Sequence, residues 1–405
     1  MFLKKIKLEG DLTVWTVVLL FMIFSFLQVL AIDGNAITHS RNLLIGLLSM
    51  YFVHRLKFKY FSKLSLVGIV LCIFLLIIVF FIGPEINDAK RWLKISSGLS
   101  FQPSDLAELI LLIFLSRQIS KYRDFLHNWS GFVKYLLLPI LLVCSLIFPS
   151  NLSTAVLLFV NCLFLMIISK LHYKYLLTIV GVPFVLSLLI YSMFSGHFSS
   201  PNIIDRKLEN HKKCFNKECV ESKDICWRYM TIRTLPRMET WVSRLDAYFY
   251  PQDDNNINEG YQLYNAKIAI KRGGLFGAGP GKGIQKHNIY APSSDFIFAN
   301  LIEQYGIILG ALPLVLLYLI FFYRSIIISQ KTKSLFGSLM VASIAFSIIL
   351  QAIGHMGVNI GLFPVTGQTL PLISQGGTSI IFTCISVGVI LSVSRNSNDR
   401  NYETI

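Results

Sequence analysis

Charged residues are scarce in this chain. Asp, Glu, Lys and Arg together make up only 15% of its 405 residues, whereas they make up about a quarter of a typical soluble domain. Apolar residues account for 54%, and several uninterrupted apolar runs approach the ~20 residues that a helix needs to cross a bilayer. The composition therefore excludes an ordinary soluble domain and predicts an integral membrane protein.

Acidic residues are the rarer kind of charge: 22 Asp and Glu stand against 37 Lys and Arg, a net charge of +15. The basic residues stand mostly in short clusters at the ends of apolar runs, which is typical of cytoplasmic loops and of contacts with anionic lipids. Because the sequence contains no basic folded domain, we expect membrane lipids as neighbours and no nucleic acid.

Paired cysteine motifs for metal binding are also missing. Of seven cysteines, four lie in apolar runs, and Cys214, Cys219 and Cys226 fall in one polar segment. One disulfide among these three with a thiol left over, or a zinc site that includes His211, are both open interpretations. The spacing gives only weak support to the zinc site.

The apolar runs predict an all-α, polytopic membrane protein with about ten transmembrane helices. The first run is too long for a signal peptide, and no cleavage site of small residues follows it. Lys and Arg gather in every second connection, which predicts an even number of spans and both termini in the cytoplasm. The expected spans cover residues 12–32, 42–55, 62–82, 105–120, 132–148, 151–169, 173–196, 296–323, 335–361 and 372–394.

A long polar interval, residues 197–295, separates the seventh span from the eighth. On this topology it is one large extracytoplasmic loop within a single membrane domain over residues 1–405. Its Lys- and Asn-rich part at 201–226 is interpreted as a flexible insert. The chain from Tyr261 onward is expected to be ordered, because it begins with an apolar patch.

The large loop contains a glycine-rich stretch, Gly273 to Gly283. Glycine permits positive φ and a close approach of the backbone to a ligand, and successive backbone N–H groups can cradle a phosphate. The stretch is not a Walker motif, because no Gly-Lys-Ser/Thr ends it and no strand precedes it. A phosphate cradle and a tight bend at the membrane surface fit it equally well.

Four acidic residues stand at or inside expected spans. Asp295 lies where the large loop enters the eighth span, as either a helix-capping acid or a general base. Asp105 and Glu108 share one face of the fourth span at i, i+3, and Glu303 lies about two turns into the eighth. Ionisable groups in a spanning helix are costly and often functional, but polar contacts between helices are an equal alternative here.

Two segments broken by Pro and Gly, 359–367 and 370–379, flank one outside loop. Irregular backbone at membrane depth persists only inside protein or along a cavity. The pattern therefore predicts a ligand cavity that opens outward.

Four motifs occur together and in the order of the SEDS family, which includes FtsW and RodA, and the resemblance covers nearly the whole chain. They are Arg91-Trp92 followed by Phe101 to Ser104, Gly273 to Gly283, Ser294 to Ala299 followed by Glu303, and Pro364 to Ser379. Asp105 stands where the family usually has Glu. Glu108 replaces a usual Lys, which reverses a charge and puts a phosphate-binding role at that position in doubt.

The resemblance implies a peptidoglycan glycosyltransferase that polymerises lipid II, the undecaprenyl-linked disaccharide-pentapeptide, and releases undecaprenyl pyrophosphate. The family's essential loop Asp corresponds to Asp295, which would act as general base on the acceptor's 4-hydroxyl. Charge and placement suggest Arg91, Lys282 and Lys90, or a divalent cation such as Mg²⁺, at the leaving pyrophosphate. No other cofactor is expected. The residues expected to contact substrate are Arg91, Trp92, Lys282, Asp105, Glu303 and Ser374.

The stretch from Arg237 to Arg244, with Trp241, and the stretch from Pro364 to Thr369 look closer to the division branch of the family. The expected setting is the bacterial cytoplasmic membrane at the division septum. Expected partners are lipid II, the growing glycan strand, a class B penicillin-binding transpeptidase and other divisome proteins. A lipid II flippase and an inert divisome scaffold are the rival functions. The acids and broken segments concentrate in the outer half of the membrane, which favours catalysis over transport.

Overall fold

The structure is a computed structural model, and it describes residues 9–32, 35–86, 89–96, 99–181, 244, 248 and 257–396. The chain forms two compact units, Met1–Ser169 with Thr240–Ile405, and Lys170–Glu239. In the second unit the described part contains a helical segment at 173–181. The predicted flexible insert at 201–226 and the cysteines Cys214, Cys219 and Cys226 lie outside the described residues.

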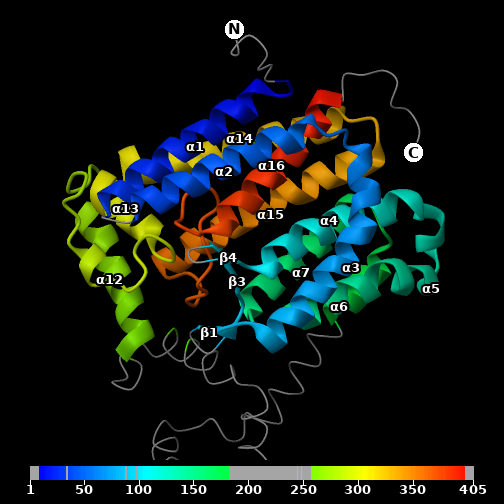
Figure 1. The fold of residues 1–405 in the computed structure, drawn as a ribbon, viewed down its shortest axis with the longest axis horizontal. Helices are drawn as coiled ribbons and strands as arrows, with labels where there is room; N and C mark the ends of the chain where they lie inside the picture. The colour runs from blue at the N-terminus through cyan, green and yellow to red at the C-terminus, as the bar shows by residue number, and fades with distance from the viewer. Residues whose placement is uncertain are drawn as a thin grey trace, which may run out of the picture. The chain divides into compact units, whose positions relative to one another are not determined.

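The first half of the larger unit is a series of helices with two small hairpins (Figure 1). The helices are α1 (Leu12–Ala31), α2 (Ala36–Arg55), α3 (Lys59–Ile82), α4 (Pro103–Lys121), α5 (Trp129–Phe132), α6 (Leu138–Ile147) and α7 (Leu152–Ile168), with a 3-10 turn η2 (Arg123–His127) and a π-helical turn η3 (Val133–Leu137). The hairpins pair β1 (Glu85–Ile86) with β2 (Ala89–Lys90), and β3 (Leu93–Ser96) with β4 (Leu99–Phe101).

The second half contains the longer helices. They are α12 (Ile257–Gly273), the 3-10 turn η5 (Gln285–His287), α13 (Ile297–Gly306), the π-helical turn η6 (Ile307–Ala311), α14 (Leu312–Lys331), α15 (Leu335–Ile360) and α16 (Thr378–Asn396). Helix α15 packs against α14 and α16 and also against α4 and α7, so it joins the two groups of helices in Figure 1.

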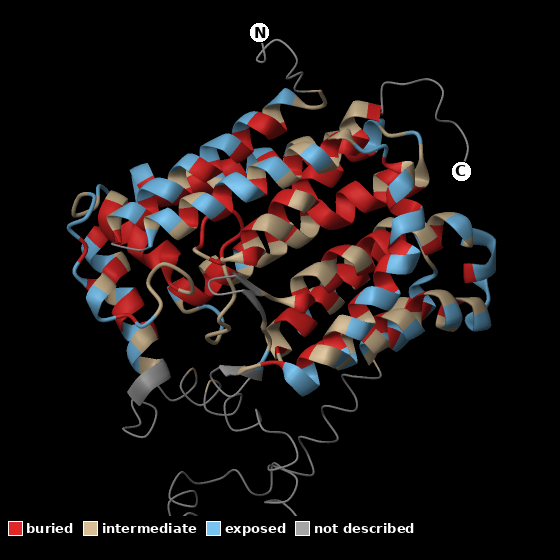
Figure 2. Cartoon of the chain, in the orientation of Figure 1, coloured by how far each residue is buried: buried red, intermediate tan, exposed pale blue. Residues whose placement is uncertain are grey.

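Six helices among the described residues are long and apolar enough to cross a membrane: α1, α3, Trp129–Ile147, Ile297–Lys331, α15 and α16. In α3 only 33% of the most apolar window is buried within the protein, although its mean hydropathy is 3.3. Apolar side chains also cover outward faces of the bundle, which appear pale blue on α3 in Figure 2. A helix that is apolar all round but largely uncovered by other protein segments needs lipid on its exposed face. The chain is therefore a multi-pass helical membrane protein.

Every predicted span includes a helix among its described residues. This confirms the predicted fold class. Four details differ. The hairpins add short strands to a chain expected to be all-α, and the second helix begins at Ala36 instead of residue 42. The tenth helix begins at Thr378 instead of residue 372, and the eighth span continues to Lys331. Helix α4 does not reach the hydropathy of a spanning helix because it carries Asp105, Glu108, Arg117 and Lys121, whose side chains need polar surroundings.

The eighth span is interrupted at Gly306, and the glycine-rich stretch causes the interruption. Gly306 has a φ of +74°, and a Cβ there would lie 2.4 Å from the carbonyl oxygen of Leu275. The next two amides, of Ile307 and Ile308, donate to the carbonyls of Gly274 and Leu275, each at 3.0 Å. These bonds replace the helical ones, and the chain passes through the η6 turn before α14 continues.

Candidate active site

Asp295 lies in the turn that leads into α13, at a half-buried position. Its backbone amide donates to the carbonyl of Ala291 at 3.1 Å, and its Oδ1 accepts a hydrogen bond from the Ser294 hydroxyl at 2.7 Å. The N-cap of α13 is Phe296, and no side chain of that residue caps the helix. The carboxylate of Asp295 is therefore not used as a helix cap, one of the two roles that the sequence left open.

Two segments distant in sequence hold the turn around Asp295. The buried Asn359, at the end of α15, donates to the carbonyl of Asp295 at 3.1 Å and accepts from the amide of Ala299 at 3.0 Å. The Ser374 hydroxyl donates to the carbonyl of Ser294 at 2.8 Å and accepts from the amide of Leu370 at 2.7 Å. Ser374 is buried, and both bonds are internal to the protein, which favours a role in shaping the site. Its contact with substrate stays a prediction.

Two arginines bring positive charge to Asp295. Arg91 follows β2, and Arg244 belongs to the large loop; both act electrostatically on the Asp295 carboxylate. The Nε atom of Arg91 is buried and makes no hydrogen bond with a described residue. Burial raises the pKa of Asp295 above its ordinary value, while the Ser294 hydrogen bond and the charges of Arg91 and Arg244 lower it. The carboxylate of Asp295 therefore lies within the electrostatic range of two guanidinium groups.

Arg244 is a site residue that the sequence analysis did not select. Its neighbourhood was noted only as a mark of the family branch, because nothing in a polar loop indicates which arginine turns inward. Four residues later, the Tyr248 hydroxyl donates to the carbonyl of Leu362 at 3.0 Å. This bond fastens the Arg244 segment to the loop that follows α15.

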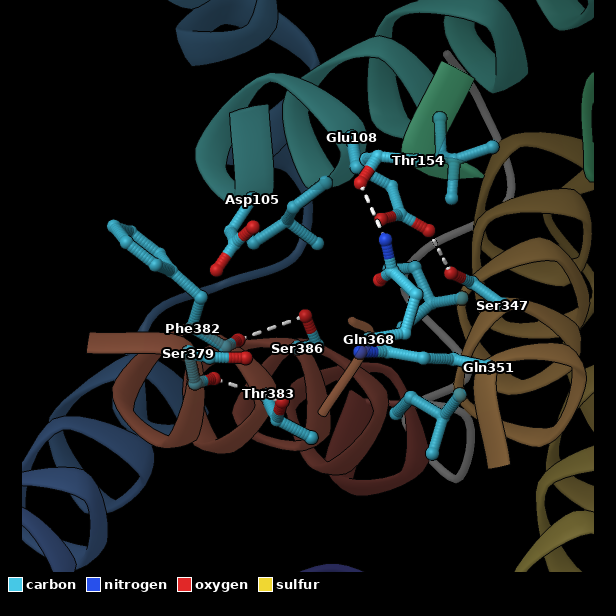
Figure 3. A pocket seen from close by; sticks show the side chains of 14 residues that line it. Asp105, Glu108, Thr154, Ser347, Gln351, Gln368, Ser379, Phe382, Thr383 and Ser386 are labelled. Carbon is cyan, nitrogen blue, oxygen red and sulfur yellow. Dashed lines mark hydrogen bonds between the residues drawn. The ribbon is translucent and has the colours of Figure 1, made fainter. Parts of the chain in front are cut away.

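A polar cavity lies between α4, α7, α15 and α16 (Figure 3). It holds about 510 Å³ of space free of atoms, its open mouth included. Asp105 and Glu108 from α4 point into it from one side, and Ser347 and Gln351 from α15 from another. The other polar residues of the lining are Thr154, Gln368, Ser379, Thr383 and Ser386. Gln368, which lies between the two broken segments, and Ser379, at the end of the second, contribute to this lining. That the cavity binds a ligand and opens to the outside stays a prediction.

Arg91 links the cavity and the Asp295 turn electrostatically, because its guanidinium acts on Asp105 as well as on Asp295. Ser379 lines the cavity together with Asp105, and Glu108 accepts a hydrogen bond from Ser347. Both acids on the predicted shared face of α4 thus line one polar space.

Glu303 has a different place from the one expected. Its side chain is fully buried, and its Oε1 accepts from the amides of Ile284 at 2.9 Å and Gln285 at 3.2 Å. Arg272 lies 3.9 Å away. A Cβ at Gly283 would come within 2.9 Å of Oε2. The carboxylate is surrounded by protein, so the geometry favours a structural role over the predicted contact with substrate.

The glycine-rich stretch is a cap on α13 and not an open phosphate cradle. The amides of Ala278 and Gly279 donate to the carbonyls of Glu303 and Gln304 at 2.8 and 3.0 Å. The amide of Gly281 donates to the side chain of Gln304 at 3.2 Å. With these N–H groups bonded inward, the geometry favours the tight bend over the phosphate cradle. The place of this bend at the membrane surface stays a prediction.

The other expected substrate contacts are less constrained. Lys282 is exposed at the tip of the glycine-rich stretch, and Lys90 is exposed beside Arg91. Trp92 is half-buried next to Arg91. No group of three His, Cys, Asp or Glu side chains that could hold a metal ion occurs among the described residues. A divalent cation at the pyrophosphate therefore stays a prediction.

Gly367 lies against the carboxylate, since a Cβ built on it would be 3.5 Å from Oδ2 of Asp295. Its φ is +66°, which costs a residue with a side chain about 1–2 kcal/mol. We expect Gly367→Ala to lower the turnover number about tenfold, through strain beside Asp295. Gly354→Ala is the matched control, because a Cβ there has only Leu157 within 4 Å, at 3.9 Å. Equal rates for the two variants would contradict the prediction.

The family model for the FtsW, RodA and SpoVE cell cycle proteins matches residues 10–210 and 225–399. The chain belongs to the FtsW/RodA/SpoVE family. This confirms the resemblance found in the sequence, which rested on four motifs of that family.

Individual relatives of this FtsW/RodA/SpoVE chain cover most of its length. A probable peptidoglycan glycosyltransferase FtsW of Legionella pneumophila is 30% identical over 366 residues, covering 88% of this chain and 80% of the relative. The stage V sporulation protein E of Bacillus subtilis is 27% identical over 359 residues, covering 87% of this chain and 85% of the relative. All of the motifs named above fall in the region that the family model matches.

Solved structures share the fold. A chain of a peptidoglycan synthase complex superposes with a TM-score of 0.74 at 22% identity, covering 96% of this chain and 99% of that one. RodA of Thermus thermophilus superposes with a TM-score of 0.65, also at 22% identity, covering 96% and 98%. Both similarities concern the membrane fold of the family.

Proposed function

We propose that the protein is a peptidoglycan glycosyltransferase that polymerises lipid II at the outer face of the bacterial cytoplasmic membrane. The observation that carries the proposal is Asp295, a half-buried carboxylate that caps no helix and stands under the charges of Arg91 and Arg244. Curated relatives named as probable peptidoglycan glycosyltransferases support it. The proposed function is the same as the one that the resemblance of the sequence motifs implied.

The chemistry is a displacement at the donor's anomeric carbon. Asp295 takes the proton from the acceptor's 4-hydroxyl, whose oxygen forms the new glycosidic bond. The bond between the anomeric carbon and the pyrophosphate oxygen breaks, and undecaprenyl pyrophosphate leaves with the electron pair. General-base assistance contributes about 10²–10⁴-fold, so the positioning of two lipid-anchored substrates supplies much of the remaining acceleration.

The leaving pyrophosphate gains negative charge, and Arg91 and Arg244 stabilise that charge. Arginine holds phosphate oxygens through paired N–H groups, and the unbonded Nε of Arg91 is one donor ready for this task. Lys282 and Lys90 remain candidates as exposed cations. The polar cavity takes a polar portion of a substrate, since polar surfaces at membrane depth occur where they line a cavity.

The proposal extends to the setting of the protein. Both termini lie in the cytoplasm, and the division septum is the site of action, as the basic loops and the division-type stretches indicate. A class B penicillin-binding transpeptidase is the proposed partner. A solved peptidoglycan synthase complex that contains a chain of this fold supports a partnership of that kind.

Polymerisation of fluorescent lipid II by the purified protein, with and without its transpeptidase, tests the proposal. We expect glycan strands that a muramidase digests. Absence of strands, together with transfer of labelled lipid II across liposomes, would establish the flippase instead. Absence of both would leave the scaffold as the function.

Removing either arginine is expected to lower kcat/KM for lipid II about 10- to 100-fold, because a hydrogen bond to a charged group contributes about 1.5–3 kcal/mol. The variants are Arg91→Gln and Arg244→Gln. Lys271→Gln serves as the control, since Lys271 is an exposed cation on α12. A loss of the same size in the control would point to a general effect of surface charge.

Polymerisation is expected to fall as the pH is lowered, because a general base acts only when ionised. Burial raises the pKa of Asp295, so its ionised fraction falls at a higher pH than that of an ordinary Asp, whose pKa is 3.8. The acid limb of kcat/KM, measured in buffers from about pH 4 to 8, should therefore lie above that value. An acid limb that persists unchanged in Asp295→Asn would belong to another group.

A further inference from the structure

The side chain of Asn359 connects the end of α15 to the start of α13. It is fully buried. Its Nδ2 donates to the carbonyl of Asp295 at 3.1 Å and to that of His355 at 2.9 Å, and its Oδ1 accepts from the amide of Ala299 at 3.0 Å. One amide group thus bonds the residues on both sides of the first turn of α13.

The bond to Ala299 gives a partner to one of the backbone N–H groups at the start of α13. The first four N–H groups of an α-helix have no partner within the helix, and the side chain of the N-cap residue commonly accepts one of them. In α13 the N-cap is Phe296, which offers no acceptor. Asn359, 60 residues away from Ala299 in sequence, supplies the missing cap from another helix.

The bond to Asp295 joins this cap to the proposed base. Because the same amide both caps α13 and holds the carbonyl of Asp295, the direction in which the helix starts and the position of Asp295 are fixed together. Through His355, Asn359 is also linked to the segment that lies beside the carboxylate of Asp295. Its Nδ2 bonds the carbonyl of His355, whose ring Nδ1 lies 2.8 Å from the carbonyl of Gln368, the residue after Gly367.

We propose that Asn359 is a positioning residue that orients the Asp295 carboxylate toward the acceptor hydroxyl. The inference rests on the proposed glycosyltransferase function for its effect on rate. The remainder of α13 is held without Asn359, because Glu303 and the glycine-rich stretch fasten its other end. Loss of Asn359 therefore acts on the first turn of the helix and leaves the helix in place.

The test compares Asn359→Ala and Asn359→Leu with Asn161→Ala. Asn359→Leu fills most of the space without making the bonds, so a loss common to both variants does not come from a cavity. Asn161 is a matched control: it is fully buried in α7, and its side-chain amide bonds no described residue. Melting temperature, kcat and KM for lipid II are measured for each protein.

We expect kcat to fall about 10- to 100-fold in both Asn359 variants, since a displacement of about 1 Å can cost 10²-fold, with KM within about twofold of the wild type. Asn161→Ala should keep its kcat. A loss confined to KM, or an equal fall of kcat in Asn161→Ala, would overturn the positioning role.

A second measurement does not depend on activity. Hydrogen exchange of the peptide that spans residues 293–299 should become faster in both Asn359 variants and stay unchanged in Asn161→Ala, because only the former remove the acceptor of the Ala299 amide. Unchanged exchange would overturn the inference even if the rate falls. Faster exchange in a protein that makes no glycan strands would leave the tertiary cap standing and reject the proposed function.

Discussion

Replacing Asp295 with Asn is expected to slow lipid II polymerisation by about 10²–10⁴-fold, the usual contribution of a general base. The amide cannot accept the proton of the acceptor hydroxyl, although it keeps the size of the side chain. It can also still accept the hydrogen bond from Ser294, which now spans 2.7 Å. The effect should therefore fall on kcat, and the melting temperature should stay close to that of the wild type.

Two further variants are compared with Asp295→Asn. Asp124→Asn removes an exposed carboxylate from the η2 turn and should polymerise at the wild-type rate, which controls for the lost negative charge. Asp295→Glu keeps an ionisable base but moves it by one methylene, so we expect an intermediate rate. If Asp295→Asn makes glycan strands as fast as the wild type, Asp295 has a structural role and the proposed mechanism is wrong.

Replacing Glu303 with Ala is expected to cost about 3–5 kcal/mol of stability, because the amides of Ile284 and the buried Gln285 lose their acceptor and each unsatisfied group costs about 1–3 kcal/mol. Arg272 adds little to this loss, since 40% of its side chain is exposed and water can solvate its charge. The melting temperature should fall by about 5–10 °C. The rate should fall as well, because the released loop leads directly into Asp295.

The size of this effect separates the structural role of Glu303 from the substrate contact that the sequence suggested. Glu303→Gln keeps one acceptor oxygen and should lose less stability than Glu303→Ala. Lys282→Ala, at an exposed position of the same loop, should not change the melting temperature. If Glu303→Ala melts like the wild type and yet fails to polymerise, Glu303 contacts the substrate after all.

The sequence predicted the membrane helices well because each depends mainly on a local run of apolar residues. The same local argument failed at α16, where the predicted span begins at residue 372 but the helix begins at Thr378. The intervening backbone is held by bonds from other segments, such as the Tyr318 hydroxyl to the carbonyl of Pro371 and the Ser25 hydroxyl to the carbonyl of Ile373 at 2.8 Å. Hydropathy contains no information about such partners.

Site residues divide in the same way. Asp295 could be selected from the sequence because a lone carboxylate at a membrane boundary stands out. Its alternative role as a helix cap could be set aside only once the bonds of α13 were known. Glu303 also stood out, but its acceptors are engaged by backbone amides about 20 residues upstream. Arg244 and Asn359 gave no signal in the sequence, since an arginine in a polar loop and an asparagine at a helix end are ordinary residues.

The hydrogen bond from Ser374 to the carbonyl of Ser294 has a consequence for the synthesis of the chain on the ribosome. The two residues are 80 positions apart, so a ribosome that adds about 5–20 residues per second makes the base roughly 4–16 s before the residue that fastens it. Until Asn359 and then Ser374 are made, the nascent chain carries Asp295 on a turn that lacks the bonds from these two residues. Activity should therefore begin only when the last two helices enter the membrane, and an unfinished polymerase cannot consume lipid II.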